Sequence, residues 1–133
     1  MKVKRPTKDT MLRTLQIGVD LQRDGKYLEA ERIYQTVLCI EPRNAQALNL
    51  MGTLAIEANE TETALDYFRK ALRGAPRDPI INNNMGNLLL RLKQNEKARQ
   101  YLLKALQAKP NFVEALCNLG KAHRLLLNGV EAE

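Results

Sequence analysis

The residue types that most often carry catalysis or bind metals are few in this sequence and far apart. Cys39 and Cys117 stand in opposite halves of the chain, outside the close cysteine and histidine spacing of metal sites. The chain has a single histidine, His123, which we expect to be packed in the core or at a groove edge. Several carboxylates fall on expected helix surfaces, where solvated charge is ordinary: Glu57, Glu60 and Glu62. We therefore expect no enzyme active site, no metal and no cofactor, and we expect both cysteines to be buried or half-buried free thiols.

Amide side chains are the more unusual chemical feature. The run Asn82-Asn83-Asn84 stands inside an expected helix, although asparagine is a mediocre helix former. Each amide offers two donors and one acceptor, so it can bind a peptide backbone without reading its sequence. The alternative is that these asparagines are solvated or pack between helices.

Length and composition predict one helical domain. The 133 residues are 44% hydrophobic, which is too apolar for a disordered tail. Two cysteines exclude a disulfide scaffold and favour a reducing compartment. No apolar run approaches the ~18 residues of a membrane-spanning helix, and the basic start lacks the apolar stretch of a signal peptide. We expect a cytoplasmic chain with no membrane partner.

The charge balance argues against a nucleic-acid partner. Lys and Arg number 21 against 15 Asp and Glu, a net charge of +6, and half of that excess lies in residues 1–10. The rest is spread over the helices, and the six aromatic residues fall mostly in packing positions. Nucleic-acid binding needs clustered charge with stacking aromatics, so we expect no specific nucleic acid.

One long period is the strongest signal in the sequence. Three kinds of residue recur at the same interval: Gly18, Gly52, Gly86 and Gly120; Pro42, Pro76 and Pro110; and Ala30, Ala64, Ala98 and Ala132. Each glycine follows an isoleucine, methionine or leucine. Three independent markers with one long period predict an internal repeat.

Each repeat is expected to contain two helices. Between Asn44 and Asn59 the apolar residues recur at spacings of three and four, which indicates an amphipathic helix. A second apolar set follows and ends before Pro76. Asp78 is expected to cap a helix with Pro79 at its first position, and turns are expected at three places: Asp24-Gly25, Asn59 and Lys93-Gln94-Asn95. Near residue 113, Asn111 with Glu114 is predicted to form a capping box.

The recurrent glycine falls in the middle of the first helix, where it costs roughly 1 kcal/mol relative to alanine. That position is explained if the second helix crosses closely there, with the small Ala30, Ala64 and Ala98 opposite. Phosphate binding is a poor alternative, because no strand precedes these glycines.

This pattern resembles the tetratricopeptide repeat, a 34-residue helix–turn–helix with a Leu-Gly-like pair, alanines, an aromatic and a closing proline. The usual early Trp is replaced by Thr14, Leu48, Asn82 and Leu116. The resemblance implies an all-α, right-handed superhelical solenoid. Residues 1–10 would be a basic leader and residues 11–133 the repeat domain, with full repeats at 11–44, 45–78 and 79–112 and a partial, capping repeat at 113–133.

The resemblance also implies a concave surface that is lined by the first helix of each repeat and holds peptides. Residues near each glycine should face it: Leu15, Gln16, Val19 and Gln22; Asn49, Leu50, Thr53 and Ile56; Asn83, Asn84, Asn87 and Leu90; Cys117, Asn118, Lys121 and Arg124. From these we select a peptide-binding set: Asn49, Thr53, Asn83, Asn84, Asn87, Asn118, Lys121 and Arg124.

Two familiar grooves of this family can be compared with that set. Asn84 and Asn118 occupy a position that resembles the asparagine ladder in the repeat domain of O-GlcNAc transferase. In the first two repeats of this chain the same position holds Gln16 and Leu50, which interrupt the ladder. The carboxylate clamp of chaperone-binding members is disfavoured, because most of its positions hold other residue types: Leu15, Val19, Thr53, Asn83 and Asn87. Lys121 and Arg124 remain able to hold an acidic group.

We therefore expect a non-catalytic scaffold that binds a peptide or protein. The alternatives are a substrate-recruiting module of a larger glycosyl- or sulfotransferase-type enzyme, and a self-association module. Repeat arrays need a polar capping helix, whereas the last helix is apolar, so we expect a homodimer through Leu116, Leu119, Leu126 and Leu127. Because Ala132 falls in register for another second helix, we expect the 133 residues to be a fragment.

Overall fold

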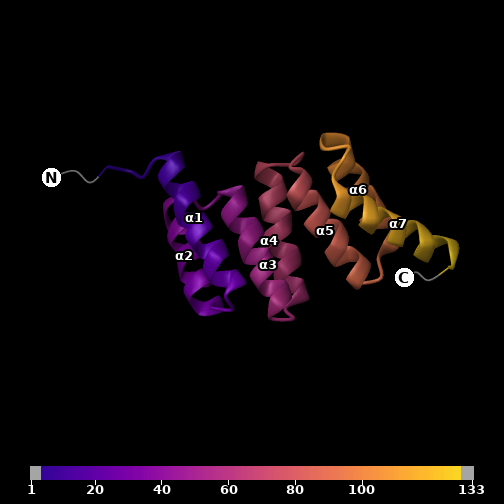
Figure 1. The fold of residues 1–133 in the computed structure, drawn as a ribbon, viewed down its shortest axis with the longest axis horizontal. Helices are drawn as coiled ribbons and strands as arrows, with labels where there is room; N and C mark the ends of the chain where they lie inside the picture. The colour runs from indigo at the N-terminus through magenta and orange to yellow at the C-terminus, as the bar shows by residue number, and fades with distance from the viewer. Residues whose placement is uncertain (1–3, 130–133) are drawn as a thin grey trace.

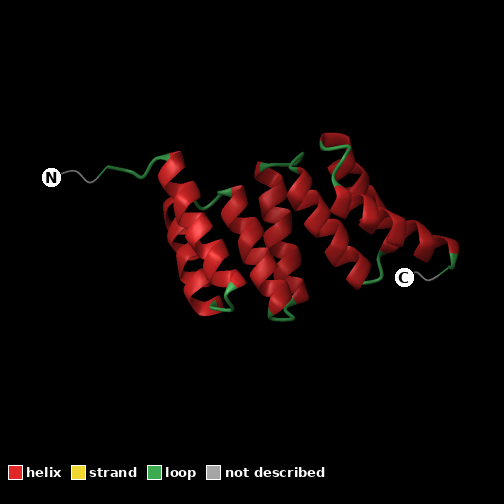
Figure 2. Cartoon of the chain, viewed as in Figure 1, coloured by secondary structure: helices red, strands yellow, loops and turns green. Residues whose placement is uncertain are grey.

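The computed structural model describes residues 4–129, and in this part of the chain helices are the only regular structure. They follow one another along the long axis of the molecule from the N-terminus to the C-terminus (Figure 1), and short loops join them (Figure 2). These seven helices confirm the predicted all-α helical-repeat solenoid: α1 (Lys8–Arg23), α2 (Tyr27–Ile40), α3 (Ala45–Glu57), α4 (Thr61–Gly74), α5 (Pro79–Arg91), α6 (Asn95–Ala108) and α7 (Val113–Leu127).

The starts of the first helices follow the register of the repeat. Asn44 caps α3 by accepting a hydrogen bond from the backbone N–H of Ala47 at 2.9 Å. Asp78 caps α5 through the backbone N–H groups of Ile80 and Ile81, at 2.9 and 3.1 Å, with Pro79 at the first turn. The predicted cap at Asp78 is therefore confirmed.

The predicted capping box of α7 is wrong. Phe112, not Asn111, stands at the N-cap, and it makes no side-chain hydrogen bond there. The reason is the register, since Phe112 occupies the position that Asn44 and Asp78 hold in the two preceding repeats. Asn111 lies one residue too early, in the exposed turn.

The turns inside the three repeats have the same backbone geometry. Gly25, Asn59 and Lys93 take positive φ angles of 81°, 62° and 61°. In each turn the next residue donates its backbone N–H to the carbonyl five residues earlier, at 2.8 to 2.9 Å. Glycine and asparagine adopt this left-handed conformation readily, so the predicted turn positions are confirmed.

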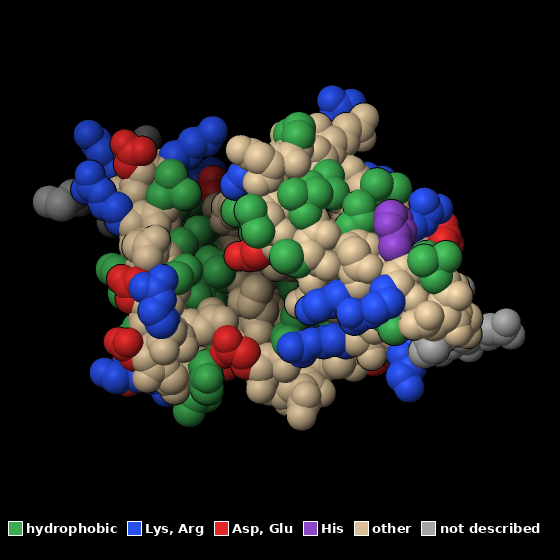
Figure 3. Space-filling view, turned by 45° about the vertical axis from the view of Figure 1, so that its right-hand side comes forward, with side chains coloured by type: hydrophobic (Ala, Val, Ile, Leu, Met, Phe, Trp, Pro, Cys, Tyr) green, Lys and Arg blue, Asp and Glu red, His purple; other side chains and the backbone are tan. Residues whose placement is uncertain are grey.

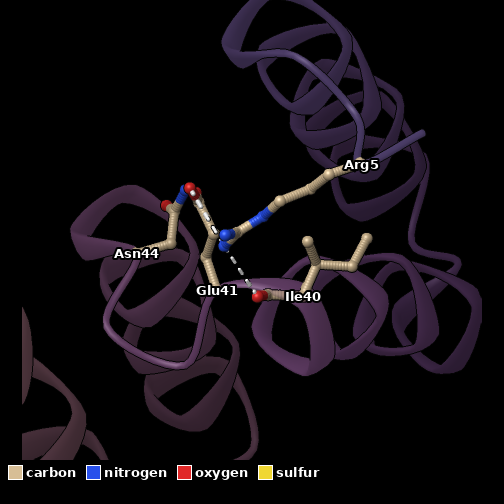
Figure 4. Close-up of polar contacts among 4 residues, drawn as sticks. All are labelled: Arg5, Ile40, Glu41 and Asn44. Carbon is tan, nitrogen blue, oxygen red and sulfur yellow. Dashed lines mark hydrogen bonds and ion pairs between the residues drawn. The ribbon is translucent and has the colours of Figure 1, made fainter.

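The N-terminal segment is attached to the turn between α2 and α3. Arg5 donates to the carbonyl oxygen of Ile40 at 3.2 Å, and its guanidinium lies 3.8 Å from the Glu41 carboxylate (Figure 4). Glu41 also accepts a hydrogen bond from Asn44 at 3.0 Å. Helix α1 begins at Lys8, ahead of the expected start of the repeat domain at Met11.

A bulky side chain covers the central glycine of each of the first three repeats. The covering residue lies on the second helix of the same repeat and is fully buried: Tyr34, Phe68 and Leu102. A Cβ added to Gly18, Gly52 or Gly86 would come closer than 3.0 Å to it. The predicted close crossing is therefore present. However, the side chains nearest to the glycines are these bulky ones, rather than the alanines expected opposite, which are also fully buried.

Gly120 differs from the other three glycines. It is exposed, and a Cβ added there would meet nothing within 4 Å. The second helix expected around Ala132 lies outside the described residues.

The difference between Gly52 and Gly120 yields a stability prediction. Gly52→Ala should destabilise the fold by about 1–3 kcal/mol, because its methyl group overlaps the buried Phe68 ring. Gly120→Ala should leave stability unchanged or raise it by up to about 1 kcal/mol through helix propensity. Urea unfolding followed by circular dichroism measures both. Equal effects of the two substitutions would contradict the close-crossing account.

Candidate functional site

Side-chain hydrogen bonds link the first helices of successive repeats. Asn84 on α5 donates to Oδ1 of Asn49 on α3 at 2.9 Å, and Asn118 on α7 donates to Oδ1 of Asn83 on α5 at 3.0 Å. We call these two bonds the amide ladder, and the surface along α1, α3, α5 and α7 the first-helix face. The ladder brings four of the predicted peptide-binding residues together.

The ladder leaves amide groups available on the first-helix face. Asn49 and Asn83 are each only 4% exposed, and their oxygens are used in the ladder. Their Nδ2 groups make no hydrogen bond in the described structure and are not sealed from solvent. Asn84 and Asn118 are half-buried and keep a free oxygen. Amide groups of this kind can donate to and accept from the groups of a peptide backbone.

Asn87 is the amide on this face with the least internal role. It lies one helical turn after Asn83, is half-buried, and its side chain makes no hydrogen bond within the described residues. Substituting it removes a potential ligand contact without breaking an internal one. Thr53, by contrast, donates its hydroxyl to the carbonyl of Leu50 at 2.7 Å.

A polar network that the residue spacing does not predict connects the first two repeats. The Tyr34 hydroxyl donates to Oε1 of Gln22 at 2.7 Å, and Gln22 Nε2 donates to Thr53 at 3.1 Å and to Glu57 at 3.3 Å. Burial, with a smaller contribution from the Glu57 carboxylate, raises the pKa of Tyr34 to about 12. The hydroxyl therefore remains a donor at neutral pH and fixes the orientation of Gln22.

The C-terminal end of the first-helix face is basic. Arg91, Lys121 and Arg124 are exposed, and none of them pairs with a carboxylate within residues 4–129. In Figure 3 the molecule is hollowed, and several Lys and Arg side chains gather beside the hollow, below the histidine. A negatively charged group of a ligand would meet unpaired cations at this end.

Other residues that the sequence analysis singled out lie elsewhere. Asn82 is 1% exposed and donates to the carbonyls of Pro76 and Asp78, at 3.0 and 2.9 Å. This asparagine of the run therefore attaches α5 to the turn before it.

Both cysteines are exposed, so their predicted burial is wrong. His123 is also exposed, which excludes the core and leaves the groove edge as the predicted place for it. Cys39 lies two residues after the buried Val37 and thus points away from the packed side of α2. Cys117 and His123 lie on α7, where the surface around Gly120 is uncovered.

The four leucines expected to mediate self-association divide into two groups. Leu116 and Leu127 are 48% and 87% exposed. Leu119 and Leu126 are half-buried, and Leu119 packs against the core of the third repeat. Leu116 and Leu127 therefore form the accessible part of the set.

Two family models for the tetratricopeptide repeat match residues 10–77 and 55–119. The chain belongs to the tetratricopeptide repeat family. Among curated protein sequences none matches the chain. Within the described residues no helix is both long and apolar enough to span a membrane.

Solved structures of other repeat proteins are similar. An O-GlcNAc transferase mutant from Thermobaculum terrenum shares 30% identity with a TM-score of 0.82, over 92% of this chain and 23% of that chain. PilF of Pseudomonas aeruginosa shares 27% identity with a TM-score of 0.82, over 87% of this chain and 53% of that one. The first repeat domain of Spaghetti (RPAP3), bound to an HSP90 peptide, shares 19% identity with a TM-score of 0.81, over 94% of this chain and 99% of that one. This last likeness concerns the fold alone. The chain thus spans about a quarter of the transferase and about half of PilF.

Proposed function

We propose that this tetratricopeptide repeat chain is a non-catalytic interaction module that binds an extended peptide or protein segment on the first-helix face. The observation that carries the proposal is the amide ladder. It fixes the four asparagines, and within residues 4–129 the Nδ2 groups of Asn49 and Asn83 make no hydrogen bond. Fixed amides bind a peptide backbone at a lower entropic cost than mobile ones. A tetratricopeptide repeat domain of similar fold is bound to a peptide, which is consistent with this role.

The basic end of the face suggests the polarity of the ligand. Lys121 and Arg124 are exposed and unpaired in the described part of the chain. They would attract an acidic residue or a carboxylate at one end of the bound segment. The middle of the segment would contact the amides.

A substrate-recruiting role in a larger transferase is the alternative. The 30% identity to the Thermobaculum terrenum O-GlcNAc transferase over 92% of this chain favours it. Such a module would bind its substrate through the same face. A catalytic domain encoded in frame with this chain would support this alternative, and its absence from the gene would refute it.

The groove proposal is tested with a linear peptide selected from a displayed random library. Asn87→Ala should weaken binding about 2- to 10-fold, the effect of losing one backbone hydrogen bond, and should leave the melting temperature unchanged. Lys121→Ala should weaken binding in a salt-dependent way. Isothermal titration calorimetry measures both variants.

The matched control is Gln100→Ala, an exposed residue on the second helix α6, which should bind like the wild type. Asn84→Ala is a less clean test, because it also breaks a ladder bond to Asn49 and should lower stability. If Asn87→Ala and Lys121→Ala both keep wild-type affinity, the peptide does not bind the first-helix face.

Self-association is a second candidate function, favoured by the uncovered surface of α7. Among the described residues no side chain covers Gly120, whereas the three equivalent glycines are covered. Leu116 and Leu127 are exposed on the same helix. We propose that a second copy of the chain covers this surface with its own α7.

Sedimentation velocity tests this candidate. The wild type should dimerise as its concentration rises, and the double variant Leu116→Ser/Leu127→Ser should remain monomeric, because it removes the exposed apolar surface. Leu103→Ser, which changes an exposed leucine on α6, should dimerise like the wild type. A monomeric wild type at high concentration would contradict the proposal.

A further inference from the structure

A cavity of about 410 Å³ lies between the first two repeats. Its walls come from the start of α2, the end of α3 and the start of α4, and none of the predicted peptide-binding residues lines it. Glu31 on α2 and Ala55 and Ala58 at the end of α3 are among its wall residues. The cavity therefore shares no lining residue with the predicted peptide-binding set, although its wall residue Glu57 is linked through Gln22 to Thr53 of that set.

The repeat sequence explains why this cavity exists. Three residues of the cavity wall are small or charged, namely Glu31, Ala55 and Ala58. The equivalent positions of the next repeat all carry leucine: Leu65, Leu89 and Leu92, in the same order. Leu65 and Leu89 are 5% and 4% exposed in the core between the second and third repeats, and Leu92 packs against them. The side chains that fill the next interface are thus missing from this one.

The charged residues that line the cavity are all acidic. They are Glu31, Glu57 and Glu60, in a chain whose net charge is +6. Glu57 accepts a hydrogen bond from Gln22, whereas the carboxylates of Glu31 and Glu60 have no hydrogen bond or ion pair within the described residues. A cation is therefore the complementary ligand.

Aromatic and aliphatic side chains accompany these carboxylates. Tyr27 and Leu28 line the cavity and are 50% and 72% exposed. Tyr67 also lines it, and the ammonium of Lys70 lies 5.9 Å from the centre of its ring. An arginine side chain matches both kinds of wall, because its stem is apolar and its planar guanidinium stacks on aromatic rings and pairs with carboxylates.

We propose that this cavity binds an arginine side chain of a partner peptide segment. The guanidinium lies between Glu31 and Glu60, and the apolar neighbours of the arginine in the partner contact Leu28 and Tyr27. The site is independent of peptide binding on the first-helix face, so either proposal can fail while the other stands.

The probe is the capped peptide acetyl-Ala-Leu-Arg-Leu-Ala-amide, titrated into ¹⁵N-labelled protein and followed by NMR. The backbone resonances of Glu31, Ala58 and Glu60 should shift as the peptide binds. The same peptide with citrulline in place of arginine keeps the shape of the side chain and lacks its charge. Its affinity should be lower by a factor of about five or more. Glu31→Gln/Glu60→Gln should have an effect of similar size.

A cavity-filling variant provides an independent measurement. Ala58→Leu copies Leu92 of the next interface at an exposed position, so it should weaken binding of the arginine peptide without lowering the melting temperature. Asn87→Ala should bind this peptide like the wild type. If the cavity-filling variant fails to fold, the peptide affinity of Glu31→Gln/Glu60→Gln tests the proposal by itself.

Three results would overturn the proposal. One is equal binding of the arginine and citrulline peptides, which would make the cavity a purely apolar site. Another is the absence of shifts at Glu31, Ala58 and Glu60 up to about 5 mM peptide. The third would identify a second copy of the chain as the occupant. In that case these resonances shift as the protein concentration rises without peptide, and Arg5→Ala removes the shift.

Discussion

The close crossing of two helices at a glycine is the constraint on which the rest of this structure depends. In each of the first three repeats a fully buried side chain lies where the side chain of the glycine would be. Helices of about 14 residues are marginal alone in water, so packing of this kind must hold them. Because the crossing recurs at the same position of each of these repeats, it gives the three helix pairs the same close packing.

The stacking of successive repeats produces both the first-helix face and the cavity. It places Asn49 beside Asn84 and Asn83 beside Asn118, so the same amide contact forms twice. It also gives the interface between the first and second repeats and the interface between the second and third repeats the same set of contacting positions. Leucine at these positions fills one interface, and Glu31 with two alanines leaves a cavity in the other. Differences between repeats, rather than the repeat itself, therefore generate the candidate binding sites.

The periodic part of the structure could be predicted from the sequence, and the contacts between helices could not. The spacing of glycine, alanine and proline sufficed for the helix pairs, the turns and the cap at Asp78, because these depend on local backbone chemistry. The amide ladder joins side chains of successive repeats, and which side chains meet follows from how those repeats are rotated and shifted. The local capping pattern points to Asn111, whereas the period of the repeat points to Phe112, and the helix follows the period.

The central claim is that the amides of the first-helix face contact a bound peptide. The most direct measurement is NMR of the side-chain amide groups in the complex with a selected linear peptide. The account predicts that the NH₂ resonances of Asn49, Asn83 and Asn87 shift on binding and exchange more slowly with water. If those resonances stay in place while backbone signals of α2, α4 and α6 move, the peptide binds the opposite side and the account is wrong.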